Sequence, residues 1–185
     1  MRWDALFRDM EAQLAAAAES AEAGEVSERV RMELGRVTLQ DRLRSQHGKQ
    51  LALDLGAAGT VCGQLSHMGE GWVAVDTGRG PALAALAHVV SIRGLDRFSS
   101  TSDGAVRLGL ASALRGIARD RSPVTLRCAN VPATQALHGT IDRVGADFLE
   151  LAAVAPGEAR RSGSVSAVYV LPLSSIALVM PQPYG

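Results

Sequence analysis

The feature that most constrains the fold is a stretch that the chain contains twice. Residues 61–75 (VCGQLSHMGEGWVAV) align without a gap on residues 137–151 (LHGTIDRVGADFLEL). Two glycines, an aromatic residue and several aliphatic residues stand in register, with Gly63 on Gly139. Self-similarity of this kind predicts two copies of one structural unit. We therefore expect the chain to fold into two similar structural units.

Each copy predicts a bent antiparallel hairpin. Apolar residues alternate up to a glycine, and a glycine inside a strand is typical of a bulge, a sharp bend or a close approach of two backbones. A short loop then returns the chain into a strand that opens with Trp72 or Phe148. We expect both rings to fill the cores beside them, because a packing constraint explains their equivalence. Stacking on nucleic-acid bases is the alternative.

Strand-like segments extend each copy on both sides. Upstream, residues 49–55 and 123–128 alternate apolar and polar side chains in strand period. Downstream, residues 86–92 and 173–179 predict a single tight turn followed by a last strand. Each unit is therefore expected to be a helix followed by about five short strands, within the size range of a small domain. The expected shape is a small closed barrel.

This order of elements, with Gly63-Gln64-Leu65 and Gly139-Thr140-Ile141 at the bend of the second strand, resembles the Sm-like (LSm) barrel family. SH3-like barrels share most of the pattern. The resemblance implies an α+β, mostly β fold of two tandem five-stranded barrels, each preceded by a helix. It also implies ring assembly through strand edges and, in many members, RNA bound by two loops. Members that bind uridine-rich RNA carry an Asp and an Asn around the loop between the second and third strands, and neither loop here contains an Asn.

The domain boundaries follow from the two units. We expect a helical arm, a first barrel, a linker, a second barrel and an extended tail, at residues 1–36, 37–95, 96–105, 106–180 and 181–185. Residues 156–164 predict an exposed loop within the second barrel.

Helical signals precede both barrels. Thr38 and Asp41 are typical of a capping box, with Leu39 and Leu43 on the buried face of the helix that they begin. Apolar residues at helical spacing over 106–117 predict the second lead-in helix.

The N-terminal arm is rich in Ala, Glu and Arg, which favours helix. Its apolar residues recur at helical spacing and are candidates for self-association: Trp3, Leu6, Phe7, Met10 and Leu14. The same stripe can instead fold back over a barrel of its own chain, and the sequence leaves both possibilities open.

Charge argues against a dedicated polyanion-binding protein. Lys and Arg together number 19, as do Asp and Glu, so no net charge draws the chain onto nucleic acid. The best candidate basic surface combines five arginines: Arg119, Arg121, Arg143, Arg160 and Arg161. A solvated loop and helix end is the plainer interpretation of most of them.

No arrangement of reactive side chains predicts catalysis. Cys62, Cys128, His67 and His138 lack the close ligand pair typical of a zinc site, so we expect no metal and no cofactor. The serines near histidines lack the spacing of a nucleophile elbow, and the phosphate-cradling motif is missing. An enzyme, with an unrecognised hydrolase as the residual case, is the least favoured class.

The compartment is expected to be the cytoplasm. No secretory signal and no apolar run of transmembrane length is visible. The two cysteines do not resemble a disulfide framework, which favours a reducing environment.

Together these features predict a non-catalytic Sm-like adaptor or scaffold that acts through self-association or contacts with another protein. The alternative is an RNA- or DNA-binding regulatory protein that uses the arginine-rich surface of the second barrel. The expected partner is another copy or another protein, nucleic acid is possible, and a membrane is not expected.

Overall fold

The structure is a computed structural model that describes residues 35–98, 108–155 and 163–182. Contacts group Met1–Asp41 and Arg42–Gly185 into separate compact units. The strands all belong to the second unit, which is described here by itself.

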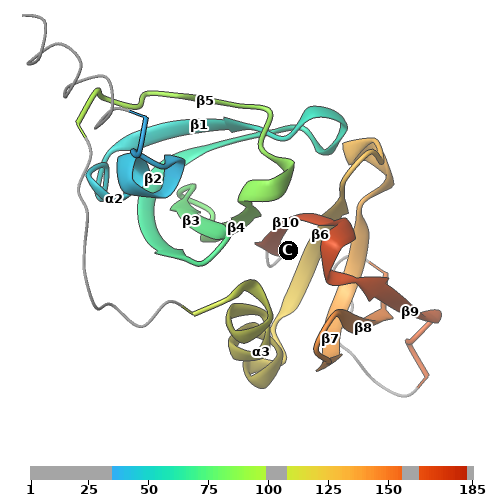
Figure 1. Ribbon diagram of the computed structural model, residues 1–185. Coiled ribbons are helices and arrows are strands. Elements are labelled where there is room, and N and C mark those ends of the chain that lie inside the picture. The colour runs from blue at the N-terminus through green and yellow to red at the C-terminus, as the bar shows by residue number, and fades with distance from the viewer. Residues whose placement is uncertain (1–34, 99–107, 156–162, 183–185) are drawn as a thin grey trace, which may run out of the picture. The chain divides into compact units, whose positions relative to one another are not determined.

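Ten strands form one antiparallel sheet in the order β5-β1-β2-β3-β4-β10-β6-β7-β8-β9 (Figure 1). The first half of the sheet comprises β1 (Gln50–Asp54), β2 (Thr60–Gly69), β3 (Trp72–Asp76), β4 (Pro81–Ala85) and β5 (Ser91–Arg93). The second half comprises β6 (Pro123–Cys128), β7 (Leu137–Val144), β8 (Phe148–Ala153), β9 (Ala167–Pro172) and β10 (Ile176–Pro181). The described part of the chain is mostly β, as expected.

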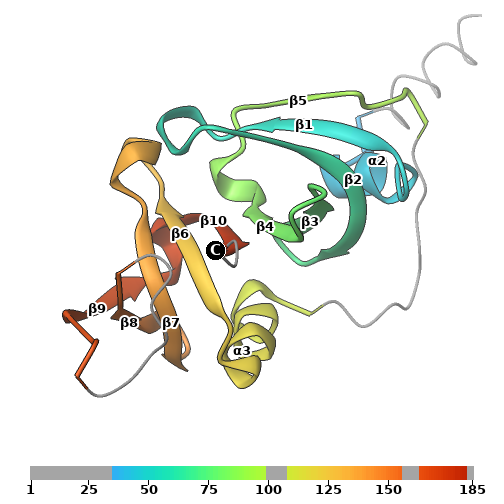
Figure 2. The same ribbon diagram turned by 180° about the vertical axis from the view of Figure 1, so that it is seen from behind.

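The prediction of two closed five-stranded barrels is wrong. Within the described residues β5 pairs with β1 and not with β4, so the first half stays open. The free edge of β4 pairs instead with β10, placing Leu178 opposite Ala84 and Val179 opposite Leu83. Any strand edge offers the same backbone donors and acceptors, so one half can satisfy the edge of the other. The two halves are thereby fused into one open sheet (Figure 2).

The internal duplication is confirmed strand by strand. Short 3-10 helices stand at the same two places in each half: η1 (Gly56–Ala58) and η2 (Leu86–His88), then η3 (Ala133–Gln135) and η4 (Leu173–Ser175). A β-bulge interrupts the second strand of each half at the same position, after Leu65 in β2 and after Ile141 in β7. Strands β1 to β5 therefore correspond in order to β6 to β10.

The paired glycines mark close backbone approaches, as predicted. A Cβ atom on Gly63 would lie 2.4 Å from the carbonyl oxygen of Asp76. A Cβ atom on Gly139 would lie 2.1 Å from the carbonyl oxygen of Ala152. The third strand of each half therefore passes the second at a distance that leaves room for glycine alone.

A capping box begins α2 (Leu39–Arg44), as predicted. The backbone N–H of Thr38 donates to Asp41 Oδ2, and the backbone N–H of Asp41 donates to Thr38 Oγ1, each at 3.1 Å. Leu43 is fully buried, but Leu39 is exposed, so the predicted burial of Leu39 is wrong. The second helix, α3 (Leu110–Asp120), extends further toward the C-terminus than the pattern over 106–117 indicated.

Each half has its own hydrophobic core, and β10 contributes to both. Ala177 and Leu178 are buried in the core of the first half. Ile176 and Val179 are buried in the core of the second half, together with Leu114 of α3. The pairing of β10 with β6 shifts register between Ile176 and Leu178, and this irregularity interrupts the alternation of side chains, so one strand can serve two cores. Strand β10 therefore contributes buried side chains to the cores of both halves.

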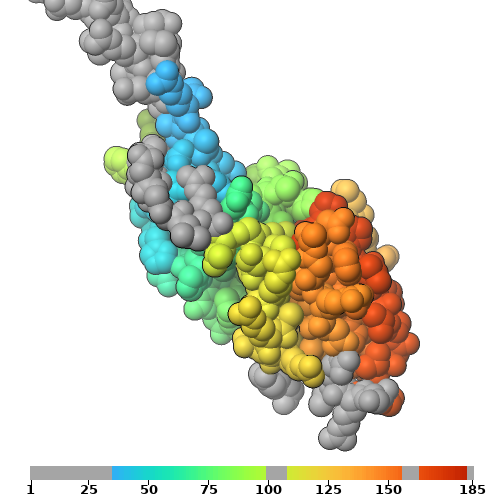
Figure 3. All heavy atoms as spheres, turned by 60° about the horizontal axis from the view of Figure 1, so that its bottom comes forward, coloured from blue at the N-terminus to red at the C-terminus, as the bar shows by residue number. Residues whose placement is uncertain are grey.

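Helix α3 covers the outer face of the first half. Trp72, Ala74 and Leu83 are buried there against residues of α3, namely Leu110, Ala113 and Ile117. Trp72 Nε1 also donates to the carbonyl oxygen of Leu108 at 2.8 Å. Figure 3 shows α3, in yellow, between the green first half and the orange second half. Trp72 was expected to fill the core of its own half; it packs on the opposite face because the helix of the second half shields it there.

Candidate functional site at the free strand edges

The ten-stranded sheet ends in two edges that are unpaired among the described residues. At one end β5 pairs only with β1, and at the other end β9 pairs only with β8. The unpaired N–H and C=O groups of an edge strand are available to a strand of another chain. These two edges are the places where the described fold can bind a partner through backbone hydrogen bonds.

Strand β9 is an apolar edge. Val168 is 58% exposed and Val170 is 63% exposed, and Tyr169 between them is 41% exposed. Exposed edges of natural sheets usually carry charges or prolines that prevent pairing with other chains. Strand β9 has only a proline at its last position, Pro172, and no charged residue. Its composition therefore favours pairing.

These three residues are absent from the candidates that the sequence patterns indicated. The available signal was the β-favouring run of Val168, Tyr169 and Val170. That run predicts a strand, but it does not distinguish an edge strand from a central one, because both sides of a buried strand are also apolar.

Strand β5 is short and has an exposed aliphatic residue beside it. Val90 precedes the strand and is 71% exposed, while its backbone N–H donates to the carbonyl oxygen of Asp54 at 2.8 Å. Ile92 packs against the core of the first half. The backbone is thus held in place while the side chain of Val90 stays in solvent.

The joint between the halves contains contacts beyond the β4–β10 ladder. Arg127 Nη1, from β6, donates to the carbonyl oxygen of Ala58 at 3.0 Å. His88 Nε2 lies 2.8 Å from the carbonyl oxygen of Ser174, so η2 and η4 are also linked. The strand pairing in this joint is therefore reinforced by side chains from both halves.

The predicted arginine surface is only partly present in the described residues. Arg119 and Arg121 are exposed at the end of α3, where Arg121 adopts a left-handed conformation with φ 50°. Arg143 forms an ion pair with Glu150 and lies over the ring of Phe148, 5.7 Å from its centroid. A carboxylate therefore already neutralises one of these cations.

Several candidate residues lie outside the described part of the chain. These are the two loop arginines and the five self-association candidates of the arm: Arg160, Arg161, Trp3, Leu6, Phe7, Met10 and Leu14.

The cysteines and histidines do not converge. Cys62 is exposed and Cys128 is half-buried, and both are free thiols. Burial raises the pKa of the Cys128 thiol, and a hydrogen bond with Ser175 offsets part of that effect. His138 Nδ1 lies 3.1 Å from Thr125 Oγ1. In the described ranges no three His, Cys, Asp or Glu side chains are grouped in a way that could hold a metal ion.

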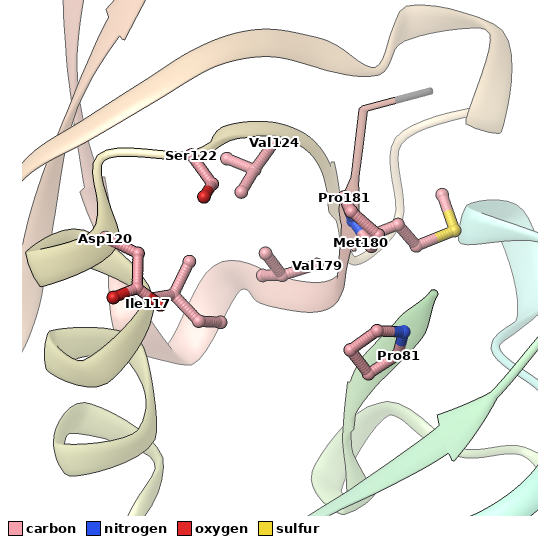
Figure 4. A pocket seen from close by; sticks show the side chains of 8 residues that line it. All are labelled: Pro81, Ile117, Asp120, Ser122, Val124, Val179, Met180 and Pro181. Carbon is pink, nitrogen blue, oxygen red and sulfur yellow. The ribbon is translucent and has the colours of Figure 1, made fainter. Parts of the chain in front are cut away.

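A cavity of about 180 Å³ opens between α3, β4, β6 and β10 (Figure 4). Most of the side chains that line the cavity are apolar, and the polar ones are Asp120 and Ser122. The residues that line it are Pro81, Ile117, Asp120, Ser122, Val124, Val179, Met180 and Pro181. A carboxylate and a hydroxyl with no histidine beside them do not make an activated nucleophile. The cavity is an apolar recess at the joint between the two halves.

No helix among the described residues is both long enough and apolar enough to span a bilayer. Comparison of the chain with protein-family models, curated proteins and solved structures finds no match. The Sm-like resemblance therefore stays a prediction.

Proposed function

We propose that this protein is a non-catalytic scaffold that self-associates through the free edges of its sheet. The observation that carries this proposal is strand β9, whose outer edge is unpaired in the described structure and whose side chains Val168, Tyr169 and Val170 are exposed. An apolar, uncharged edge offers both backbone hydrogen bonds and a surface that gains free energy when water is removed from it.

The internal joint supports a head-to-tail arrangement of copies. Strand β4 corresponds to β9, and β5 corresponds to β10, because the two halves repeat each other in order. The chain already pairs β4 with β10. The same pairing between two chains joins β9 of one copy to β5 of the next. Such a heterologous contact produces a ring when it closes and a filament when it does not.

The Sm-like resemblance points in the same direction, because it implies assembly through strand edges. The two free thiols fit a reducing compartment, and we propose the cytoplasm.

The test is the mass of the purified protein in solution, measured by sedimentation over a wide concentration range. We expect the mass to rise in multiples of the 19.4 kDa chain. The double variant Val168→Lys with Val170→Lys is expected to stay monomeric, because two charges on the edge oppose pairing. Leu108→Lys is the matched control, since Leu108 is also exposed but lies on neither edge. A wild-type chain that stays monomeric throughout would exclude self-association.

Binding of nucleic acid is the competing function, and the same preparation tests it. Single-stranded RNA and duplex DNA are titrated at two salt concentrations, because phosphate contacts weaken steeply as salt rises. Tight, salt-sensitive binding that is lost in Arg119→Ala with Arg121→Ala would favour a regulatory protein over a scaffold. The ion pair of Arg143 with Glu150 argues against that outcome.

A further inference from the structure

The apolar recess at the joint between the halves reaches from the surface to a hydrophobic core. Val124 and Val179 form part of its wall, and they also belong to the core of the second half, where each is only 2% exposed. Figure 4 shows Pro81 of β4 across the recess from Ile117 of α3. A molecule in the recess would therefore contact both halves of the sheet and the helix between them.

One side of the recess carries negative charge. Asp120 is the last residue of α3, and among the described residues its carboxylate has no ion-pair or hydrogen-bond partner. The C-terminus of a helix also carries a partial negative charge from its unpaired carbonyl groups. Ser122 adds a hydroxyl that is free of partners in the same described ranges. This side of the recess therefore favours a positively charged group that can donate hydrogen bonds.

The arginines on either side of Asp120 do not line the recess. Arg119 and Arg121 are both exposed, and neither belongs to the lining. Consecutive residues of a helix point in different directions, and Arg121 adopts a left-handed conformation after the helix ends. Their charges act through solvent, where salt screens them. Asp120 is therefore the one charged residue in the lining of the recess.

The volume of the recess sets the size of a ligand. The recess measures about 180 Å³. An apolar cavity of about 150 Å³ is large enough to hold benzene. Water beside the apolar walls finds few hydrogen-bond partners, so an apolar group that replaces it gains free energy. The recess therefore has room for one small ring or short chain that carries a single charged group.

We propose that the recess binds a small organic cation, whose benzene-sized apolar body lies against the valine walls and whose ammonium group lies on the Asp120 carboxylate. An ammonium group has several N–H donors, so it can donate to the carboxylate and to the Ser122 hydroxyl together. The site is separate from the proposed self-association, because none of its residues belongs to β5 or β9. The inference adds a ligand-binding activity at the joint between the halves.

The first test compares three ligands of similar size that differ in charge: benzylamine, benzyl alcohol and benzoate. Each is titrated into the whole chain, and binding is followed by the NMR shifts of methyl groups that line the recess, on Ile117, Val124, Val179 and Met180. We expect benzylamine to bind about fivefold more tightly than benzyl alcohol, a factor at the upper end for an ion pair with an exposed carboxylate. Benzoate is expected to bind most weakly, because its carboxylate repels that of Asp120.

The second test removes the charge of Asp120 alone. Asp120→Asn keeps the size of an exposed side chain, and we expect it to lower the affinity for benzylamine about fivefold while the affinity for benzyl alcohol stays the same. Asp147→Asn is the matched control, because it makes the same change of charge at an exposed aspartate between β7 and β8, outside the recess. It is expected to leave both affinities unchanged. Circular dichroism checks that both variants are folded.

The results that would overturn this proposal differ from those that exclude self-association. Equal binding of benzylamine and benzyl alcohol, or an unchanged affinity in Asp120→Asn, would show that the carboxylate does not select the ligand. Tighter binding of benzoate would show that Arg119 and Arg121 dominate the charge at the recess. An absence of methyl shifts with all three ligands would show that the recess does not bind molecules of this size. Self-association depends on β5 and β9, so it stands or falls separately.

Discussion

Replacement of Gly139 by alanine tests the reasoning about the bent strands most directly. The added Cβ would lie 2.1 Å from the carbonyl oxygen of Ala152 and 3.0 Å from the Cα of Ala153. These are backbone atoms of β8, so no side chain can rotate away, and β7 and β8 have to separate. Overpacking of this kind costs roughly 1–3 kcal/mol, and the rigid neighbours place Gly139→Ala at the upper end of that range.

Gly116→Ala is the matched control, with the same chemical change and the opposite expected sign. Gly116 lies inside α3, and a Cβ there would meet no atom within 4 Å. Alanine is favoured over glycine in a helix interior by roughly 0.5–1 kcal/mol. Gly116→Ala is therefore expected to stabilise the fold, whereas Gly139→Ala destabilises it.

Urea unfolding followed by circular dichroism measures both effects through the midpoint concentration. With a slope of about 1–3 kcal/mol per molar urea, the two variants should move the midpoint in opposite directions by amounts that are easily resolved. Gly63→Ala should behave like Gly139→Ala, because its Cβ would lie 2.4 Å from the carbonyl oxygen of Asp76. A neutral or stabilising Gly139→Ala would show that the close approach of β7 and β8 does not constrain this position.

Two further predictions concern single side chains. Trp72→Phe keeps most of the apolar ring but removes the hydrogen bond to the carbonyl oxygen of Leu108. We therefore expect a loss of about 1 kcal/mol in the free energy of unfolding, measured by the same urea series. An unchanged midpoint would mean that this hydrogen bond adds nothing to the docking of α3. Iodoacetamide at mildly alkaline pH should alkylate exposed Cys62 of the native protein before Cys128, as followed by mass spectrometry of peptides. The reason is that burial raises the pKa of the Cys128 thiol and lowers its thiolate fraction at that pH. Faster labelling of Cys128 would contradict its burial.

Local features of this fold could be predicted because they depend on residues close together in the sequence. The repeat located Gly63 and Gly139, whose close approaches the structure confirms. The capping box of Thr38 and Asp41 was also correct, since both partners lie within one helical turn. The candidate residues of the binding surface were not found, because the exposure of Val168 and Val170 depends on which strand is left at the edge.

The sequence by itself determined that one β unit occurs twice, where its second strand bends and where a tight turn precedes its last strand, because these follow from glycine positions, turn residues and alternating side chains. Only the tertiary structure decided that the units stay open, that β4 pairs with β10, and that Trp72 lies beneath α3. The physical reason is that the backbone of every strand edge carries the same donors and acceptors. The choice of partner edge is therefore made by the packing of distant side chains, and a local pattern does not contain it.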